Sequence, residues 1–234
     1  HAQVGFNYGV SSISAVLKNR GHTTKLLNIN EKLVAIPDDN RIIDIINEFK
    51  PGLIGFSVVT PQYQYALRIA KLIRSSCDVP IVCGGIHATI VPDEVLEENC
   101  FDYACVGEGE YSMLDLVTAL EAKAGTFNIP GIWAKNNGTL IKNNVRPFLD
   151  ITELPKNDYE IFDLQRMIDE ENGWIRVMAS RGCPFRCTYC LNHQIVGIYE
   201  RDTGMKGTQL NYTRRRSVDD VLDDSHDTWC LVSN

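Results

Sequence analysis

The sequence GLIGFSVVTPQYQYALRIAKLIRSSCDVPIVCGG, at residues 52–85, contains the pattern that decides the fold. Its first part, GLIGFSVVT, is a continuous apolar run, which is typical of a strand buried on both faces of a sheet. The next part, PQYQYALRIAKLIRSS, opens with Pro61 at a favourable position for a helix start. The last part, PIVCGG, predicts a second strand that ends in two glycines. These segments together predict a strand–helix–strand unit with parallel strands.

The same alternation continues on both sides of this unit, over residues 10–124. Further helices are predicted at SSISAVLKNRG (11–21), NRIIDIINEF (40–49), PDEVLEEN (92–99) and YSMLDLVTALEAK (111–123), and further strands at TKLLNI (24–29) and FDYACVG (101–107). This order implies an α/β fold in which helices cover a parallel sheet. The few residues before the first helix are rich in Gly and Asn, so we expect the first strand to be missing through truncation at the N-terminus.

The pattern changes after residue 124. IPGIWAKNNGTLIKN (129–143) predicts a hairpin that turns at Asn137-Gly138. Residues 144–172 contain prolines and mixed charges, as a linker does, and WIRVMAS (174–180) predicts a strand that leads into a cluster of cysteines. We therefore expect a first domain at 1–128, a hairpin and linker at 129–172, and the start of a second domain at 173–234.

Composition excludes several classes of protein. The chain has 234 residues and a formal net charge of −7, which argues against general affinity for nucleic acid or for an anionic membrane. No apolar run reaches the roughly 18 residues that a membrane-spanning helix needs. The eight cysteines stand at positions 77, 83, 100, 105, 183, 187, 190 and 230. In a chain of this length they do not predict a disulfide framework, so a reducing cytoplasm is the expected location.

Three of these cysteines lie close together in RGCPFRCTYCLN (181–192), spaced CxxxCxxC. A structural zinc site needs a fourth ligand, and the spacing to His193 is unusual for one. A ferredoxin site uses four thiolates, and buried structural thiols without a ligand are the simplest alternative. The fourth interpretation is a [4Fe–4S] cluster that Cys183, Cys187 and Cys190 hold through three of its irons, leaving the fourth iron free to bind a ligand.

The segment SRGCPFRCTYC (180–190) resembles the radical S-adenosylmethionine (SAM) enzymes. In that family, the three cysteines bind the [4Fe–4S] cluster and the open iron chelates the methionyl group of SAM. One electron from the cluster then cleaves SAM to a 5′-deoxyadenosyl radical. The aromatic residue before the last cysteine, here Tyr189, lies near the adenine. RRRSVDD (214–220) is similar to a segment between the first two barrel strands of family members.

The resemblance also has a gap. The family's partial (β/α) barrel takes about 200 residues, and a glycine- and glutamate-rich motif that contacts SAM follows its second strand. That motif is absent from the sequence, and SHDTWCLVSN (225–234) does not predict a barrel strand. We therefore expect the chain to be the N-terminal part of a longer enzyme, which alone would cleave SAM poorly.

Four segments before the cysteines, LKNRGH (17–22), GLIGFSVVT (52–60), GGIHAT (84–89) and VGEGE (106–110), resemble in their order the flavodoxin-like cobalamin-binding domain that precedes many radical SAM barrels. Ligands of a doubly wound sheet bind at the carboxyl ends of its strands. The resemblance implies cobalamin contacts from eight residues at such ends: Ser57, Thr60, Gly84, Gly85, His87, Gly107, Glu108 and Gly109.

Each of these segments also has a purely structural interpretation. Paired glycines often form only a tight turn. A single histidine such as His87 is more often a satisfied loop residue than a ligand, and Glu108 and Glu110 could complement the N-terminus of a helix. Cys83 and Cys105 lie inside predicted strands, where we expect them to pack in the core.

The sequence further predicts that no histidine of the chain binds the lower face of cobalamin. Cobalamin modules that supply one carry DxHxxG just before the first helix. In HAQVGFNYGV (1–10), one alignment puts Val4 and Phe6 at the Asp and His positions, and another puts Ala2 at the His position. His22 is predicted at the opposite edge of the sheet, and His87 follows a different strand.

The expected function is therefore that of a cobalamin-dependent radical SAM enzyme, with a [4Fe–4S] cluster, SAM and cobalamin as cofactors. The resemblance implies methyl transfer to an unactivated centre or ring formation, on a small molecule or natural product. It also implies a one-electron reductant such as flavodoxin or ferredoxin. Two alternatives remain: a non-catalytic corrinoid carrier or sensor, which would have no use for the three cysteines, and a radical SAM enzyme whose N-terminal domain no longer binds cobalamin.

Overall fold

The computed structural model describes residues 5–136, 138–174 and 176–232. The chain forms two compact units. The first, which we call the sheet unit, consists of Asp39–Leu149 and Cys183–Tyr212. The second, the terminal unit, consists of the chain up to Asp38, of Asp150–Gly182 and of the chain from Thr213. The CxxxCxxC segment is therefore part of the sheet unit. The domain boundaries expected from the sequence stay a prediction.

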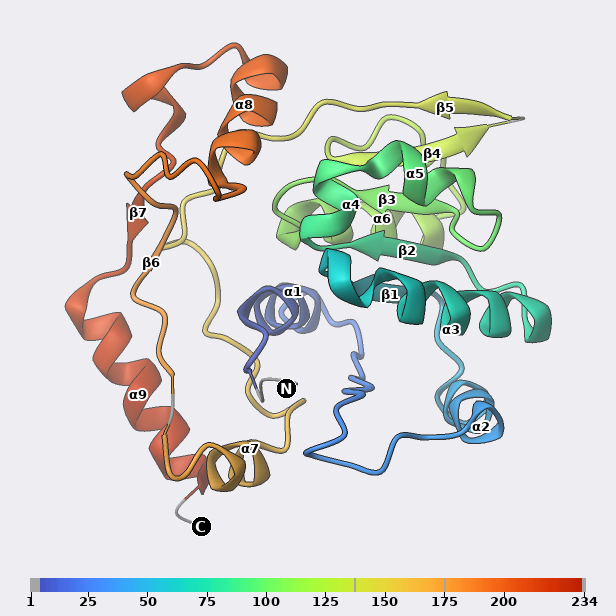
Figure 1. Cartoon of the computed structure of the whole chain (residues 1–234), viewed down its shortest axis with the longest axis horizontal. Coiled ribbons are helices and arrows are strands. Elements are labelled where there is room, and N and C mark those ends of the chain that lie inside the picture. Colours follow the sequence, from blue (N-terminus) through green and yellow to red (C-terminus); the bar gives the residue numbers. More distant parts are fainter. Residues whose placement is uncertain (1–4, 137, 175, 233–234) are drawn as a thin grey trace. The chain divides into compact units, whose positions relative to one another are not determined.

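The sheet unit is built on five strands in the order β1-β2-β3-β4-β5 (Figure 1). Strands β1 (Ile54–Ser57), β2 (Ile81–Gly84) and β3 (Tyr103–Cys105) are parallel to one another. Strands β4 (Ile132–Asn136) and β5 (Thr139–Ile141) continue the sheet in antiparallel fashion. The α/β fold with a parallel sheet is therefore confirmed, and the strand–helix–strand unit at 52–85 lies in it as predicted.

Strand β1 differs from its prediction in one respect. We expected burial on both faces, but the burial of its residues alternates between partly buried and exposed. The reason is its position, since β1 is the end strand in the order of this sheet. Strand β2, which has a neighbour on each side, is the one whose Ile81, Val82 and Cys83 are all buried. The continuous apolar run thus predicted the strand correctly but not its position at the end of the sheet.

Helices join and cover these strands. They are α2 (Asp39–Phe49), the short 3₁₀ turn η1 (Thr60–Gln62), α3 (Tyr63–Ser76), α4 (Ile86–Ile90), α5 (Pro92–Glu97), α6 (Glu110–Glu121), α8 (Asn192–Thr203) and the turn η2 (Gly207–Leu210). In Figure 1, α3 and α5 lie in front of the sheet and α6 behind it. The four predicted helices of this unit are present, and α4 was not predicted because GGIHAT contains only one turn of helix.

The hairpin predicted at 129–143 is formed by β4 and β5. Gly138 has the left-handed φ of +80° that its turn requires, whereas Asn137 lies outside the described residues. Beyond the hairpin, an apolar cluster holds α8 in the unit. Its buried members are Val106, Val145, Tyr199 and Leu210.

The terminal unit contains α1 (Tyr8–Lys18), α7 (Leu164–Glu170), α9 (Val218–Val232) and a two-stranded antiparallel sheet of β6 (Ser180–Arg181) and β7 (Arg214–Arg215). Asn7 caps the start of helix α1, since its side chain accepts a hydrogen bond from the Val10 N–H at 3.1 Å. Asp158 fixes this helix, since it accepts hydrogen bonds from Ser14 and Lys18. Leu33, Tyr159, Phe162, Leu164 and Met167 form the apolar core of the unit.

Two sequence predictions are wrong in this unit, and a third segment contains a helix that the sequence did not predict. TKLLNI (24–29) forms no strand: Leu26 packs against the core and Leu27 is exposed, as in a strand, but no strand pairs with this segment in the part of the chain that the structure describes. The linker at 144–172 contains helix α7, which Asp163 caps through the Arg166 N–H. The strand at 174–180, whose Ile175 lies outside the described residues, is reduced to Ser180–Arg181.

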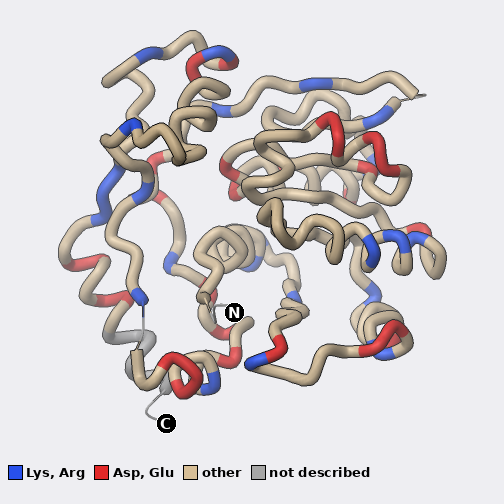
Figure 2. Tube along the Cα trace, viewed as in Figure 1, with Lys and Arg blue, Asp and Glu red and all other residues tan. Residues whose placement is uncertain are grey.

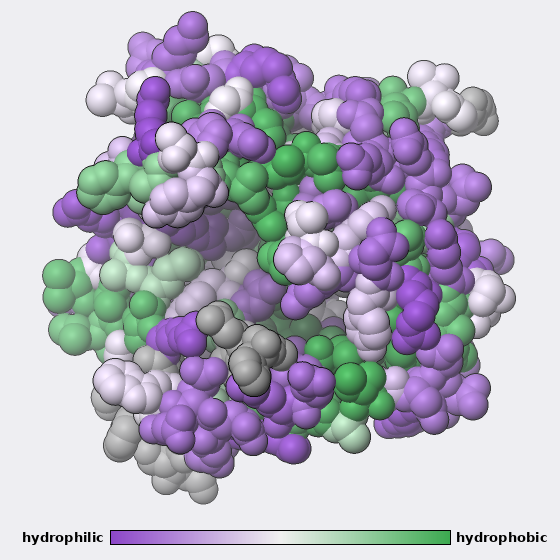
Figure 3. Space-filling model, in the orientation of Figure 1, coloured by the Kyte–Doolittle hydropathy of each residue, from purple (hydrophilic) through white to green (hydrophobic). Residues whose placement is uncertain are grey.

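Several surface charges of the sheet unit form ion pairs. Arg68 lies 2.7 Å from Asp39 and Lys71 lies 2.8 Å from Glu98, and Arg74 pairs with Asp102. Figure 2 shows acidic and basic residues interspersed along the trace. On the face seen in Figure 3, hydrophilic residues interrupt the apolar patches. No helix in the described part of the chain is both long and apolar enough to cross a membrane.

Candidate functional site

The loops that follow β1, β2 and β3 meet at one edge of the sheet, because the three strands are parallel. We call this the carboxyl edge and define it as Ser57–Thr60, Gly84–His87 and Gly107–Glu110. It contains all eight residues for which the sequence implied cobalamin contacts. In a doubly wound sheet, this is the edge at which ligands bind. The structure therefore brings the predicted residues together, although they differ in what they contact.

Gly85 brings the first two loops together. It has a φ of +90°, and a Cβ at this position would lie 2.6 Å from the Val58 nitrogen and 2.7 Å from its oxygen. The Val58 N–H donates to the Gly84 oxygen at 2.9 Å, and the His87 N–H donates to the Val58 oxygen at 3.1 Å. The contact between the two loops therefore requires a glycine, whether or not a ligand lies above it.

His87, whose N–H takes part in this contact, is buried and only 5% exposed. Its Nδ1 lies 3.2 Å from the Thr60 hydroxyl, and its ring centroid lies 4.0 Å from that of Tyr63. Burial lowers the pKa of His87, which favours the neutral imidazole. Its Nε2 is buried and has no hydrogen-bond partner among the described residues. The ring is thus oriented by Thr60 and Tyr63 and keeps one polar atom unused.

The third loop is occupied by contacts within the protein. The Glu108 N–H donates to the hydroxyl of Tyr199 on α8 at 2.8 Å. The Glu108 carboxylate accepts the Leu149 N–H at 3.2 Å, and the Gly107 N–H donates to the Thr89 hydroxyl at 3.1 Å. Polar groups of VGEGE therefore stabilise the fold around β3. This agrees better with the structural interpretation of the motif than with ligand contacts.

The first two loops are the accessible part of the carboxyl edge. Ser57, Thr60 and Gly85 are exposed, and Gly84 is partly buried. Two hydroxyl groups and a glycine backbone can approach a bulky ligand closely and can exchange hydrogen bonds with amide groups on it. The physical properties of this part of the edge agree with cobalamin contacts at Ser57, Thr60, Gly84 and Gly85, which stay a prediction.

The cysteine segment follows a different pattern of burial. Cys183, Cys187 and Cys190 are each partly buried and form no disulfide, while the residues between them are exposed. Phe185 is 71% and Tyr189 is 90% exposed. The Cys190 N–H donates to the Cys187 oxygen at 3.0 Å, which closes a turn at the end of the segment. Three accessible thiols within one short loop form a suitable donor set for an iron–sulfur cluster.

The cysteine thiols differ from one another in burial. Among the residues that the structure describes, no three His, Cys, Asp or Glu side chains lie close enough together to hold a metal ion. Cys83, Cys100 and Cys105 differ, since burial raises their pKa values, to about 12 for Cys83 and Cys105. The prediction that Cys83 and Cys105 pack in the core is confirmed.

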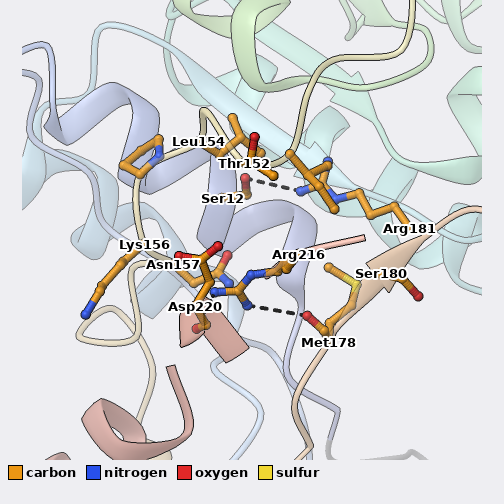
Figure 4. Close-up of a pocket in the computed structure, with 12 residues that line it drawn as sticks. Ser12, Thr152, Leu154, Lys156, Asn157, Met178, Ser180, Arg181, Arg216 and Asp220 are labelled. Carbon is orange, nitrogen blue, oxygen red and sulfur yellow. Dashed lines mark hydrogen bonds between the residues drawn. The ribbon is translucent and has the colours of Figure 1, made fainter. Parts of the chain in front are cut away.

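A small cavity of about 70 Å³ lies within the terminal unit (Figure 4). Arg181 reaches Ser12 of α1 across it at 3.3 Å. Arg216, from the RRRSVDD segment, pairs with the buried Asp224 at 2.7 Å and donates to the Met178 oxygen at 3.4 Å. The arginine side chains in this cavity thus join elements of the unit.

Three residues at or near the carboxyl edge were not identified from the sequence: Tyr63, Thr89 and Tyr199. Tyr63 packs on His87, and Thr89 bonds the loops after β2 and β3, since it also donates to the Gly85 oxygen at 2.9 Å. The motif GGIHAT includes Thr89, so its hydroxyl could have been singled out. Tyr199 stands 91 residues from Glu108, and no local pattern connects the two.

Comparison with known proteins agrees with this arrangement. Residues 2–117 match the model of the B12 binding domain family. The chain is 32% identical to an uncharacterized methyltransferase of Pyrococcus horikoshii over 152 residues, which are 64% of this chain and 33% of that protein. It is 29% identical to the anaerobic magnesium-protoporphyrin IX monomethyl ester cyclase of Rubrivivax gelatinosus, over 77% of this chain and 34% of that protein. The chain thus spans about a third of the length of these relatives.

Solved structures show the same fold. The cobalamin-dependent SAM radical enzyme OxsB, with aqua-cobalamin bound, matches 99% of this chain and 30% of its own with a TM-score of 0.76 and 23% identity. The radical SAM methyltransferase TsrM of Kitasatospora setae, with tryptophan and a SAM analogue bound, matches 96% of this chain and 42% of its own with a TM-score of 0.70 and 19% identity. By its sequence and its fold, this chain belongs, over residues 2–117, to the B12 binding domain family.

Proposed function

We propose that this chain is part of a cobalamin-dependent radical SAM enzyme. The observation that carries the proposal is that the sheet unit combines two features. One compact unit contains the three parallel strands β1–β3, which lie in the region that matches the B12 binding domain, and, at Cys183–Cys190, three accessible free thiols in the spacing CxxxCxxC. A corrinoid carrier has use for the first feature but not for the second.

Cys183, Cys187 and Cys190 are the proposed ligands of a [4Fe–4S] cluster. With three thiolates, one iron stays open for the amino and carboxylate groups of SAM. Tyr189, which is 90% exposed, has a free ring face for the adenine of SAM to stack on. When bound, the cluster and SAM supply a one-electron cleavage of SAM, and cobalamin supplies a carrier for a methyl group.

The accessible residues of the carboxyl edge are the proposed cobalamin contacts. Ser57 and Thr60 offer hydroxyl groups, and Gly84 and Gly85 offer backbone without a side chain in the way. His87 supports these contacts indirectly, since its Nδ1 orients the Thr60 hydroxyl. Gly107, Glu108 and Gly109 shape the third loop.

The proposed reaction is methyl transfer to an unactivated centre or ring formation on a small molecule. A methyltransferase and a ring-forming cyclase are both among the relatives. A relative from Streptomyces wedmorensis is named cytidylyl-2-hydroxyethylphosphonate methyltransferase and is 25% identical over 92% of this chain. A cytoplasmic location and a one-electron reductant such as flavodoxin or ferredoxin complete the proposal, and no nucleic acid is expected as a partner.

Anaerobic purification and reconstitution test the proposal. We expect about four irons and four sulfides per chain, together with one cobalamin. With SAM and a reductant, the full-length protein should form 5′-deoxyadenosine or methylate its substrate. Cobalamin without iron and sulfide would indicate a carrier, and a cluster without cobalamin would indicate that the domain has lost its ligand. One tightly bound zinc with no sulfide would contradict the assignment of the cysteines.

A further inference from the structure

Helix α8 begins directly after the cysteine segment, so its position determines where the last cysteine lies. Leu191, the residue before the helix, is also the neighbour of Cys190. Apolar contacts of Ile195, Val196 and Ile198 hold the helix in the sheet unit, and hydrogen bonds fix it at two further places. Near its C-terminal end, the Asp202 carboxylate accepts the Val145 N–H at 3.1 Å. The main-chain oxygen of Asp202 accepts a hydrogen bond from the Asn144 side chain, also at 3.1 Å. The other place is Tyr199.

Tyr199 is 1% exposed and lies among the apolar residues that hold α8. Its ring stacks on Phe148 with 3.6 Å between the ring centroids and an interplanar angle of 11°. Its hydroxyl accepts the Glu108 N–H at 2.8 Å. A buried ring with a satisfied hydroxyl has one stable position, so the helix surface at Tyr199 is held against the loop after β3.

The loop after β3 is built to accept this hydroxyl. A Cβ at Gly107 would lie 2.5 Å from the Tyr199 oxygen and 3.3 Å from a methyl group of Val145. The Gly107 N–H of this loop donates to the Thr89 hydroxyl, and the Thr89 hydroxyl donates to the Gly85 oxygen. Gly85 in turn lies against the Val58 backbone. A chain of direct contacts therefore leads from the helix after the cysteines to the accessible part of the carboxyl edge. All of it lies within the sheet unit.

From this chain of contacts we infer that Tyr199 is a positioning residue, whose hydroxyl couples the cysteine segment to the carboxyl edge. A cluster held by Cys183, Cys187 and Cys190 would constrain the loop that leads directly into α8, and would therefore act on the start of the helix. Tyr199 passes this change to Glu108 and Gly107, and from there to the residues that contact cobalamin. The inference rests on the proposed function, because it requires a cluster at the first site and cobalamin at the second.

Coupling of this kind is a measurable linkage. If cluster formation changes the affinity for cobalamin by some factor, then cobalamin changes the stability of the cluster by the same factor. Typical couplings between two sites span about 5- to 150-fold. A single hydrogen bond places this coupling at the lower end of that range. We therefore expect cluster formation to change the dissociation constant of hydroxocobalamin by about fivefold or more.

The experiment measures this constant with the whole chain, before and after anaerobic reconstitution of the cluster, for the unaltered protein and for Tyr199→Phe. The variant keeps the ring on Phe148 and loses the acceptor for the Glu108 N–H. We expect its two constants to agree within about twofold, while iron, sulfide and cobalamin still bind. Tyr103→Phe is the matched control, since it removes a hydroxyl that bonds Thr126 at 3.2 Å from the beginning of the same strand, β3.

The outcomes are distinct. A loss of coupling in Tyr199→Phe, with coupling kept in Tyr103→Phe, supports the inference even if both variants unfold at lower temperature than the unaltered chain. Equal coupling in Tyr199→Phe and in the unaltered chain overturns it, and so does an unaltered chain that binds both cofactors independently. Failure of the unaltered chain to bind either cofactor would overturn the proposed function, and the coupling with it.

Discussion

At the scale of single residues, burial separates the cysteines into two groups. Cys83, Cys100 and Cys105 lie in the core, where desolvation raises their pKa values and disfavours the thiolate. Cys183, Cys187 and Cys190 are partly exposed and stand within one loop. Because a metal binds thiolates, the second group is the one suited to hold iron.

This difference gives a first prediction. Replacing Cys183, Cys187 or Cys190 with Ala should abolish reconstituted iron and sulfide, because two thiolates do not retain the cluster. The same replacement of Cys77 or Cys100 should leave both unchanged. Colorimetric iron and sulfide analysis of anaerobically reconstituted protein measures the effect. Full iron content in any of the first three variants would contradict the assignment.

His87 gives a prediction about pH. Burial lowers its pKa below the ordinary value of 6.5, although Glu94 acts in the opposite direction. The unfolded chain therefore binds a proton at a higher pH than the folded chain does. The stability that His87 contributes is complete above about pH 6.5 and declines as the pH falls from there to the pKa of the folded state.

Chemical denaturation between about pH 7.5 and about pH 5 tests this. The free energy of unfolding of His87→Gln should depend less on pH in this window than that of the unaltered chain. An unchanged dependence in His87→Gln would show that the ring titrates alike in both states.

The lower face of cobalamin gives a further prediction at this scale. Of the positions that would correspond to the missing motif, Val4 and Ala2 lie outside the described residues, and Phe6 packs against Phe162 with ring centroids 4.4 Å apart. We therefore expect no axial nitrogen from the chain. Electron paramagnetic resonance of the Co(II) form should show cobalt lines without nitrogen splitting. Splitting that disappears in His87→Ala would identify His87 as the ligand and refute the prediction.

At the scale of elements, the contact between the loops after β1 and β2 depends on Gly85. Gly85→Ala places a Cβ against the Val58 backbone at a φ of +90°. We expect it to lower the free energy of unfolding by about 1–3 kcal/mol. Gly197→Ala is the control, because Gly197 lies inside α8 and a Cβ there has nothing within 4 Å. That change should be neutral or should stabilise by up to about 1 kcal/mol. Thermal and denaturant unfolding measure both, and equal stability of the two variants would show that the loops can separate freely.

The elements that sequence reasoning found are those whose signal is local. Helical spacing of apolar residues and flanking prolines predicted α2, α3 and α6, and apolar runs predicted β2 and β3. The elements it missed depend on partners far along the chain. TKLLNI has the composition of a strand but no strand beside it among the described residues, and helix α7 was hidden in a segment rich in charge and proline.

The residues of the candidate site show the same division between local signals and distant partners. Glycines after strands and the spacing of the cysteines pointed to the carboxyl edge and to the cysteine loop. The sequence could not tell which of these groups are already engaged. Gly107 and Glu108 resemble ligand contacts, yet one faces the Tyr199 hydroxyl and the other accepts the Leu149 N–H. Such contacts join residues 41 and more positions apart, and no local pattern encodes them.

At the scale of the whole molecule, the sheet unit combines two sites that are far apart in the sequence. Its sheet comes from residues 54–141 and its cysteine loop from residues 183–190. The proposed ligand donors of the two sites do not overlap: they are thiols at one site, and hydroxyl groups and glycine backbone at the other. Each site should therefore be removable while the other still binds its cofactor.

Two variants test this separation. Ser57→Tyr places a bulky side chain at an exposed position of the carboxyl edge, so it should weaken hydroxocobalamin binding by about tenfold or more, which corresponds to about 1.4 kcal/mol, and keep iron and sulfide. The triple replacement of Cys183, Cys187 and Cys190 with Ala should lose iron and sulfide. It should bind cobalamin with the affinity that the unaltered chain shows before its cluster is built. Ser57→Ala, which adds no bulk, controls for the loss of the hydroxyl. Loss of both cofactors in the triple variant, with an unchanged unfolding temperature, would mean that the thiols belong to the cobalamin site itself.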